Sequence, residues 1–520
     1  MTVRVGRPGA CTLAYSRMTD RERAPEREWQ DSFASIAAAV ALIALGGWLR
    51  LHDLPSMEFK NDEREALVLA SQVGLAPATW PDRGMLSSGG VANAPLFTWI
   101  VAGLGQVSAN PLAITAVIAV INTLCLLPLW RWALRRIGRT RAMLLLAIIS
   151  VSPFAVLYSR KIWTQNLLLP GVLLILWGIE WLRTGKTWRG VIALTAAALV
   201  AGQLHQSGPI ALALLPLALL IQWRVDCATH RAVAAPSRPT PLECGVLAIV
   251  IALNAFFWFP YLRYLATLPV ETITNRVRAD AFGPFLLWHI GGQIAPSDLF
   301  HFFAWDRDDF LDGLTRYWSY RASMILGTPL FAYGLWRWLR APTALPVIGI
   351  WWILVIVAFM LARITTHTFY TLILAPAPAF LAAGGFDPPA LPALIRRVLS
   401  VWRIAYVVAL LSLTVTMQRW ISDRGGATPD YGISYRVRYD QARNIVALLS
   451  GRQQDPFARG FTTNPEPGPP LNCDAPPPEV RWLVGNFADA DVHVPDQLRI
   501  CERWIRRDDG LRYQWQLQMR

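Results

Sequence analysis

Residues 33–50 read FASIAAAVALIALGGWLR, an apolar run bounded by charged residues. A bilayer core of about 30 Å needs roughly 20 mainly apolar residues in one helix, so this run is long enough to cross a membrane. Three arginines precede it between residues 21 and 27, as in a signal peptide, but no small-residue cleavage site follows. We therefore expect a retained signal anchor, with residues 1–32 forming an N-terminal tail in the cytoplasm.

Similar apolar runs recur along the chain as far as residue 420. The expected spans lie near residues 33–50, 110–130, 142–158, 162–182, 189–204, 209–223, 242–265, 324–339, 345–362, 367–385 and 403–420. They predict an α-helical polytopic membrane protein with about 11 transmembrane helices across residues 33–420. The composition agrees, because 54% hydrophobic and 16% charged residues exclude an ordinary soluble protein, in which about a quarter of residues are charged.

The basic residues, which give the chain a net charge of +14, are concentrated in alternate loops. The loops on the N-terminal side of the membrane contain Arg131, Arg135, Arg136, Arg139, Arg141, Arg183, Lys186, Arg189, Arg224, Arg231, Arg238, Arg337, Arg340, Arg396, Arg397 and Arg403. The short turns on the other side contain only Arg160, Lys161 and Arg363. By the positive-inside rule, the N-terminus is cytoplasmic, the C-terminus is outside, and no nucleic-acid partner is needed to explain the charge.

Residues 421–520 contain no spanning run and are long enough for a small soluble domain. We expect an α+β outer (periplasmic) domain, and Gly432, Tyr435 and Arg438 are candidates to place a segment of it against a cleft at the outer surface. Its expected elements are a short helix at Asp440–Leu449 and strands at Val480–Val484 and Tyr513–Leu517. If the outer compartment is oxidising, the disulfide candidates in this domain are Cys473 and Cys501.

Two loops on the outer side, residues 51–109 and 266–323, are long, and loops of more than about 15 residues are usually functional or disordered. In the first, residues 57–65 read MEFKNDERE, and an apolar helical stretch follows at Ala66–Val73. The loop ends in APLFTW (residues 94–99) and an apolar run too short to span separately. For this run we expect an amphipathic helix at the membrane surface.

Three further motifs follow in order on the outer side. Residues 152–160 read SPFAVLYSR before Trp163, residues 204–207 read LHQS, and residues 367–370 read HTFY ahead of a Leu-Ala-Pro sequence. Two features of the first outer loop precede them: the acidic pair Asp62–Glu63, and the Pro-Leu-Phe motif with its amphipathic helix. Together, these features resemble the GT-C superfamily of lipid-linked-sugar-dependent glycosyltransferases. The nearest in style are the protein O-mannosyltransferases of glycosyltransferase family 39 and the bacterial aminoarabinose transferases, and the resemblance spans residues 33–420.

The resemblance implies a GT-C-like transmembrane domain and an inverting glycosyltransferase in the bacterial inner (plasma) membrane. Such an enzyme moves a sugar from a polyprenyl-phosphate donor to a lipid, glycan or protein acceptor on the outer face, in contact with membrane lipids. By analogy, Asp62 is the candidate base for the acceptor hydroxyl. Glu63 is a candidate to orient the acceptor, to act as the base itself, or to bind a divalent cation (Mg or Mn) together with Asp62. The alternative for Asp62 is a solvated carboxylate or a helix N-cap.

The donor phosphate requires cations, and the outer turns supply few. The candidate phosphate-binding residues are Arg160, Lys161 and Arg363, since guanidinium groups bind phosphate bidentately and ammonium groups add a point charge. For all three, snorkelling to lipid headgroups is the alternative. The candidate substrate-binding residues are His205, His367 and Tyr370. Their alternatives are a hydrogen-bonded structural histidine and an interfacial anchoring tyrosine.

Two other function classes remain open. A transporter or a flippase of lipid-linked glycans should carry ionisable residues near the membrane midplane, where each costs roughly 2.5–3.5 kcal/mol on insertion scales. The predicted spans are nearly free of such residues, and the candidate residues collect at one face. A catalytically inactive scaffold of envelope assembly is the other alternative, and the intact Asp62–Glu63 pair counts against it.

Overall fold

The structure, a computed structural model, describes most of the expected membrane region and parts of the C-terminal region. The described residues are 33–76, 79–87, 91–108, 110–228, 238–269, 284–296, 299, 314–340, 347–361, 368–387, 391–426, 434–440, 498–507 and 510–519. The expected strand at Val480–Val484, and the expected helix beyond Asp440, lie outside these residues. Nothing described bears on the N-terminal tail.

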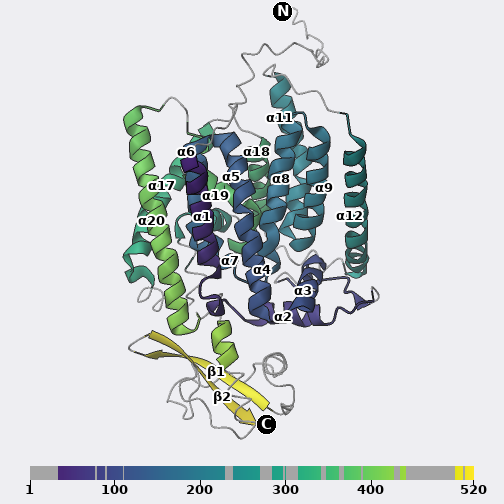
Figure 1. Cartoon of the computed structure of the whole chain (residues 1–520), viewed down its shortest axis with the longest axis vertical. Coiled ribbons are helices and arrows are strands. Elements are labelled where there is room, and N and C mark those ends of the chain that lie inside the picture. Colours follow the sequence, from purple (N-terminus) through teal and green to yellow (C-terminus); the bar gives the residue numbers. More distant parts are fainter. Residues whose placement is uncertain are drawn as a thin grey trace, which may run out of the picture.

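Helices running side by side form a bundle (Figure 1). Its long helices are α1 (Phe33–Leu51), α4 (Pro111–Leu124), α5 (Leu126–Ile137), α6 (Arg139–Val151), α8 (Leu168–Arg183), α9 (Thr187–Leu204), α11 (Leu215–Ala228), α12 (Pro241–Thr267), α17 (Trp318–Arg340), α18 (Val347–Leu361) and α20 (Ala393–Arg424). Shorter helices are α7 (Pro153–Tyr158), α10 (Ser207–Ala213), α14 (Pro284–Gly292) and α19 (Pro376–Ala382). Single turns of 3₁₀ helix are η1 (Leu54–Ser56), η3 (Thr164–Leu167), η5 (Leu314–Arg316) and η7 (Thr368–Leu374).

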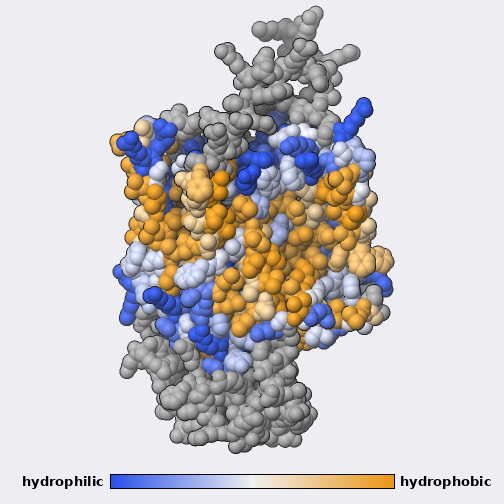
Figure 2. Space-filling view, viewed as in Figure 1, coloured by the Kyte–Doolittle hydropathy of each residue, from blue (hydrophilic) through white to orange (hydrophobic). Residues whose placement is uncertain are grey.

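This bundle is that of a polytopic membrane protein. Within the described residues, 7 helices are long and apolar enough to cross a membrane: Phe33–Leu51, Pro111–Ile137, Thr164–Arg183, Thr187–Leu204, Ser207–Cys227, Pro241–Thr267 and Ala393–Asp423. On the face shown in Figure 2, apolar residues form a belt, and hydrophilic residues gather above and below it. Each of the expected spans contains helix, although several are broken, as where Pro153 and Pro376 begin new helices.

Close contacts between small residues hold the helices together. Gly178 of α8 faces Gly190 of α9, and a Cβ on Gly190 would lie 2.9 Å from the carbonyl oxygen of Gly178. Small residues allow such close approach where lipid provides no hydrophobic drive between helices. The long helix α20 is tied to its neighbours by hydrogen bonds, because Gln418 and Thr414 donate to the carbonyl oxygens of Leu49 and Val151, each at 2.6 Å.

The two ends of the bundle differ. At the lower end in Figure 1 lie α2 (Asn61–Ser71) and α3 (Leu96–Val107), which confirm the helices expected after the acidic pair and at the Pro-Leu-Phe motif. We call this the α2 end. At the opposite end the chain turns from α5 into α6 through Gly138, and α20 begins at Ala393. We call this the basic end.

The described part of the C-terminal region contains a two-stranded antiparallel hairpin. Strand β1 (Leu498–Arg507) pairs with β2 (Gly510–Met519), with Leu498 opposite Met519 and Arg507 opposite Gly510. The strand expected at Tyr513–Leu517 is therefore confirmed as part of β2. Its partner β1 was not expected, because the alternation of apolar and charged residues in LRICERWIRR is irregular.

Candidate active site

The acidic pair lies at the start of α2. Asp62 and Glu63 occupy its first turn, where carboxylates interact favourably with the helix dipole. The Oε2 atom of Glu63 accepts a hydrogen bond from the backbone N–H of Lys60 at 3.0 Å, which satisfies one of the helix's unpaired donors. Glu63 is fully buried, whereas Asp62 is partly exposed. The two neighbouring carboxyl groups therefore have different environments.

Burial raises the pKa of Glu63 to about 8, although the positive charge of Lys60 opposes the shift. Near pH 7 this carboxyl group is mostly protonated. A protonated, buried Glu63 that caps a helix is a poor proton acceptor and a poor metal ligand. Asp62 is the member of the pair that reaches solvent, and its role as a base stays a prediction.

The pKa of Glu63 predicts how stability changes with pH. The folded protein holds this proton more tightly than the unfolded chain, whose pKa is near the ordinary 4.5. The free energy of unfolding should therefore fall as the pH rises from about 4.5 to about 8, by at least about 1 kcal/mol. Glu63→Gln keeps the capping acceptor but cannot ionise, so thermal unfolding of this variant should lose that part of the pH dependence. An unchanged pH dependence in the variant would contradict the assignment.

A second charged cluster surrounds Glu58, which sequence reasoning had not singled out. Glu58 is fully buried and pairs with Lys161, also fully buried, and with Lys60 at 2.9 Å. Both ammonium groups lie over the ring of Trp163, that of Lys161 at 3.9 Å and that of Lys60 at 5.5 Å from the centroid. Among the described residues, this Glu58 cluster therefore brings two cations to one carboxylate. In the sequence, this cluster could have been suspected from the MEFK stretch (residues 57–60), which lies just before the acidic pair.

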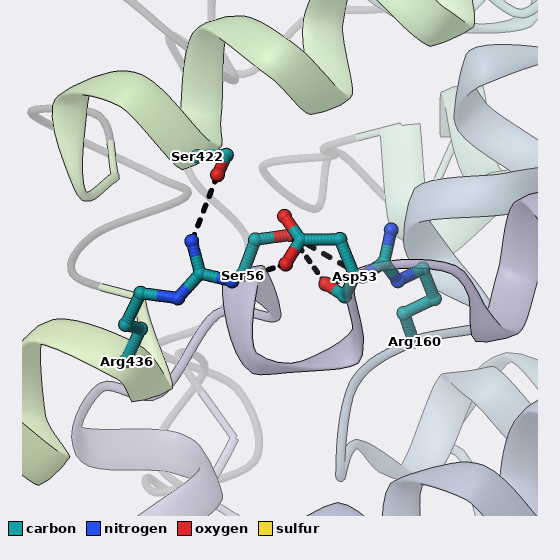
Figure 3. A network of polar contacts seen from close by, with 5 residues as sticks. All are labelled: Asp53, Ser56, Arg160, Ser422 and Arg436. Carbon is teal, nitrogen blue, oxygen red and sulfur yellow. Dashed lines mark hydrogen bonds and ion pairs between the residues drawn. The ribbon is translucent and has the colours of Figure 1, made fainter.

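Arg160 holds the turn after α1 in place (Figure 3). It is buried and donates to the backbone oxygen of Asp53 and to Oγ of Ser56 at 3.3 Å. The side chain of Asp53 pairs with Arg436, which also donates to Ser422 at 2.9 Å. These contacts hold Arg160 against the turn after α1, and the phosphate-binding role expected for it stays a prediction.

His205 also has structural partners. It lies in the turn between α9 and α10 with 2% of its surface exposed. Its Nδ1 accepts the backbone N–H of Ser207 at 3.2 Å and lies 2.8 Å from the Ser207 hydroxyl. Burial lowers the pKa of His205 to about 3, so the ring is neutral at pH 7. These contacts agree with a hydrogen-bonded structural histidine, and the substrate-binding role of His205 stays a prediction.

The remaining candidates fall partly or wholly outside the described residues. Arg363, His367 and Cys473 lie outside them. Tyr370 lies in η7 and Cys501 in β1, and only the backbone of each is described. Their proposed roles in substrate binding and in a disulfide stay predictions.

A segment of the C-terminal region packs against the Glu58 cluster. Ser434 pairs with Glu58 through the backbone, and the N–H of Tyr435 donates to the oxygen of Met57 at 2.8 Å. The ring of Tyr435 meets that of Phe59 edge-on, with centroids 5.5 Å apart. The expectation that Tyr435 places this region against the membrane part agrees with these contacts.

The turn that carries Lys161 also lines a cavity of about 70 Å³ within the bundle. Tyr158, Ser159 and Asn166 come from this turn, and Arg50 closes another side. Arg50 is held by the backbone oxygens of α1 and α6, among them that of Ser150 at 3.1 Å. The same turn therefore places Lys161 on Glu58, and Tyr158, Ser159 and Asn166 on the cavity inside the bundle.

The divalent cation expected with Asp62 and Glu63 stays a prediction. No group of three or more His, Cys, Asp or Glu residues among the described residues could hold a metal ion. Of the two proposed ligands, Glu63 is buried and occupied in capping the helix.

No protein-family model matches the sequence, and no curated protein matches it. Among solved structures, ArnT from Cupriavidus metallidurans bound to undecaprenyl phosphate matches with a TM-score of 0.48 and 13% identity, over 93% of this chain and 97% of that one. The archaeal oligosaccharyltransferase AglB from Archaeoglobus fulgidus, in complex with an inhibitory peptide and a dolichol-phosphate, matches with a TM-score of 0.41 and 12% identity, over 85% of this chain and 62% of that one. At these values neither assigns an activity to this chain.

Proposed function

We propose that the chain is an integral-membrane, inverting glycosyltransferase that uses a polyprenyl-phosphate sugar. The basic end would face the cytoplasm of a bacterial inner membrane, and the α2 end would face the outer side, where the acceptor lipid, glycan or protein arrives. The observation that carries the proposal is the partly exposed Asp62 beside the buried Glu63 and the two lysines of the Glu58 cluster. This transfer requires a base that takes the proton of the acceptor hydroxyl and cations that stabilise the leaving phosphate.

In the proposed reaction, Asp62 accepts the proton of the acceptor hydroxyl as its oxygen attacks the anomeric carbon. The bond from this carbon to the phosphate oxygen breaks, and the polyprenyl phosphate leaves with the electron pair. Direct displacement inverts the configuration at the anomeric carbon. The leaving phosphate needs no protein acid, because it departs as an anion that cations stabilise.

Lys60 is the cation that we place nearest the donor phosphate. Its side chain is 24% exposed, whereas that of Lys161 is fully buried behind Trp163. Lys161 would keep the Glu58 carboxylate balanced, so that the cluster as a whole attracts an anion. Arg363, His367 and Tyr370 remain proposed contacts of the donor and the acceptor.

The proposal is tested with the purified full chain in nanodiscs, radiolabelled polyprenyl-phosphate sugars as donors, and extracted envelope lipids, glycans or proteins as acceptors. We expect label to move to one acceptor fraction with inverted anomeric configuration. Lys60→Met should raise the donor KM about tenfold or more, since a hydrogen bond to a charged group contributes roughly 1.5–3 kcal/mol. Arg83→Met, which changes another cation near the α2 end, is the control. Absence of transfer from every donor, with the protein folded, would refute the proposal.

A further inference from the structure

A second cleft lies at the basic end, away from α2 and the Glu58 cluster. It measures about 810 Å³ and lies between the turn from α5 to α6 and the first turns of α20. Its charged lining residues are Arg139, Arg141, Asp387, Arg396, Arg397 and Arg403. Five cations thus face one space with a single carboxylate. The proposed transfer reaction makes no use of this cleft.

A buried ion pair and a closely packed glycine form one wall of the cleft. Arg403 is 4% exposed and donates to Oδ2 of Asp387 at 2.6 Å and to the backbone oxygen of Ala382 at 3.0 Å. Gly384 adopts φ +83°, and a Cβ there would lie 2.1 Å from the same Asp387 oxygen. Only glycine fits this position without moving the ion pair. Asp387 therefore pairs with Arg403, and no second carboxylate is found among the described residues that line the cleft.

The N-terminus of α6 opens into the same cleft. Gly138, Arg139, Thr140 and Arg141 all line it, and no side chain caps the helix start. Unpaired N–H groups and the positive end of a helix dipole attract anions. Combined with arginines from two different helices, they favour a group that accepts several hydrogen bonds at once. Phosphate is such a group, because guanidinium binds it bidentately.

The α20 wall of the cleft, which carries Arg396, Arg397 and Arg403, also has an apolar part, and this helix projects beyond the membrane. With 32 residues, α20 is about 48 Å long, compared with a hydrocarbon core of about 30 Å. Its first turns therefore reach the headgroup region. There Val401 and Ile404 line the cleft, and Leu394 and Val398 are 73% and 53% exposed. In Figure 2 the apolar belt ends at a band of hydrophilic residues at this end of the molecule.

We propose that this cleft binds the phosphate-bearing headgroup of an anionic phospholipid whose acyl chains lie along α20. Free phosphate shares the headgroup chemistry but would gain nothing from the apolar wall. Basic pockets between transmembrane helices are a known means of holding anionic headgroups. Arg396 and Arg397 are exposed at the mouth, so they are the residues that a lipid arriving from the bilayer would meet first.

The test compares the full-length protein with the double variant Arg396→Gln/Arg397→Gln. Both are reconstituted in phosphatidylcholine nanodiscs with or without phosphatidylglycerol, and lipid that remains bound after extraction is counted by native mass spectrometry. Since each arginine near a membrane surface contributes roughly 1 kcal/mol, phosphatidylglycerol should bind about 30-fold more weakly to the double variant. Arg224→Gln/Arg340→Gln removes the same charge from exposed arginines outside the cleft and should leave binding unchanged.

Inorganic phosphate forms the second arm, measured by calorimetry and by competition with phosphatidylglycerol. We expect millimolar phosphate neither to bind measurably nor to displace the lipid. Phosphate binding without lipid binding would overturn the assignment to a phospholipid. Equal lipid retention by the cleft variant and the wild type would overturn the site itself. An equal loss in the control pair would also overturn it, because binding would then follow overall charge. Because Arg396 and Arg397 are exposed, neither substitution disturbs a buried contact.

Discussion

Asp62→Asn should lower the rate of sugar transfer by about 100-fold or more while leaving the protein folded and inserted. A positioned general base contributes roughly 10²–10⁴ to a rate, and asparagine keeps the shape of aspartate but cannot take the proton. The side chain is partly exposed, and the helix cap beside it is made by Glu63, so little stability depends on the charge. The loss should appear in kcat, measured with saturating donor and acceptor.

Glu63→Gln is the matched control, because it makes the same chemical change one residue away in the same turn. Since burial keeps Glu63 mostly protonated near pH 7, its amide counterpart should transfer sugar at a rate within about threefold of the wild type. Asp82→Asn, at an exposed loop position, should be neutral. If Glu63→Gln were inactive and Asp62→Asn active, the roles of the two carboxyl groups would be exchanged. If both were active, the acidic pair would not contain the base.

The sequence could predict the membrane region well because one dominant force shapes it. A run of about 20 apolar residues has few alternatives to a spanning helix, and each such run contains helix in the structure. Where the helices break depended on local details, such as the prolines that begin α7 and α19. The start of α2 was also readable, since an acidic pair directly before an apolar helical stretch is typical of a helix N-terminus.

The pairing of the site residues could not be read from the sequence. Arg160 and Lys161 were grouped because both are cations at the end of one span. The structure separates them: Arg160 contacts the Asp53 turn, and Lys161 contacts Glu58. Which partner each cation finds depends on segments more than 100 residues away, and spacing carries no information about that. Arg436 makes the same point, because its contact with Asp53 joins the C-terminal region to the first loop.

The different environments of Asp62 and Glu63 could not be predicted from the sequence either. Adjacent residues of a helix point in different directions, so one of two neighbouring carboxyl groups can be buried while the other meets solvent. Sequence reasoning could nominate Asp62 and Glu63 together, but their burial had to come from the packing around α2. That packing divides the pair into a capping group and a candidate base.

Lys161→Met should destabilise the fold strongly, by about 3–5 kcal/mol, because it leaves the buried carboxylate of Glu58 without one of its two cations. Methionine approximates the length of the lysine stem and keeps an apolar contact with Trp163, so the loss reports the charge more than the packing. Thermal unfolding of the purified protein measures it. An unfolding temperature equal to that of the wild type would contradict the buried ion pair.

The double variant Glu58→Gln/Lys161→Met separates this structural role from a catalytic one. It removes both buried charges, and such pairs can be replaced by neutral groups at little cost, so stability should recover by about 1–3 kcal/mol relative to the single variant. The net charge of the Glu58 cluster is unchanged, because one cation and one carboxylate are removed together and Lys60 remains. Donor KM should therefore stay near the wild-type value. A stable double variant with a tenfold higher donor KM would instead place Lys161 itself on the donor phosphate, since Lys60 alone would not then suffice.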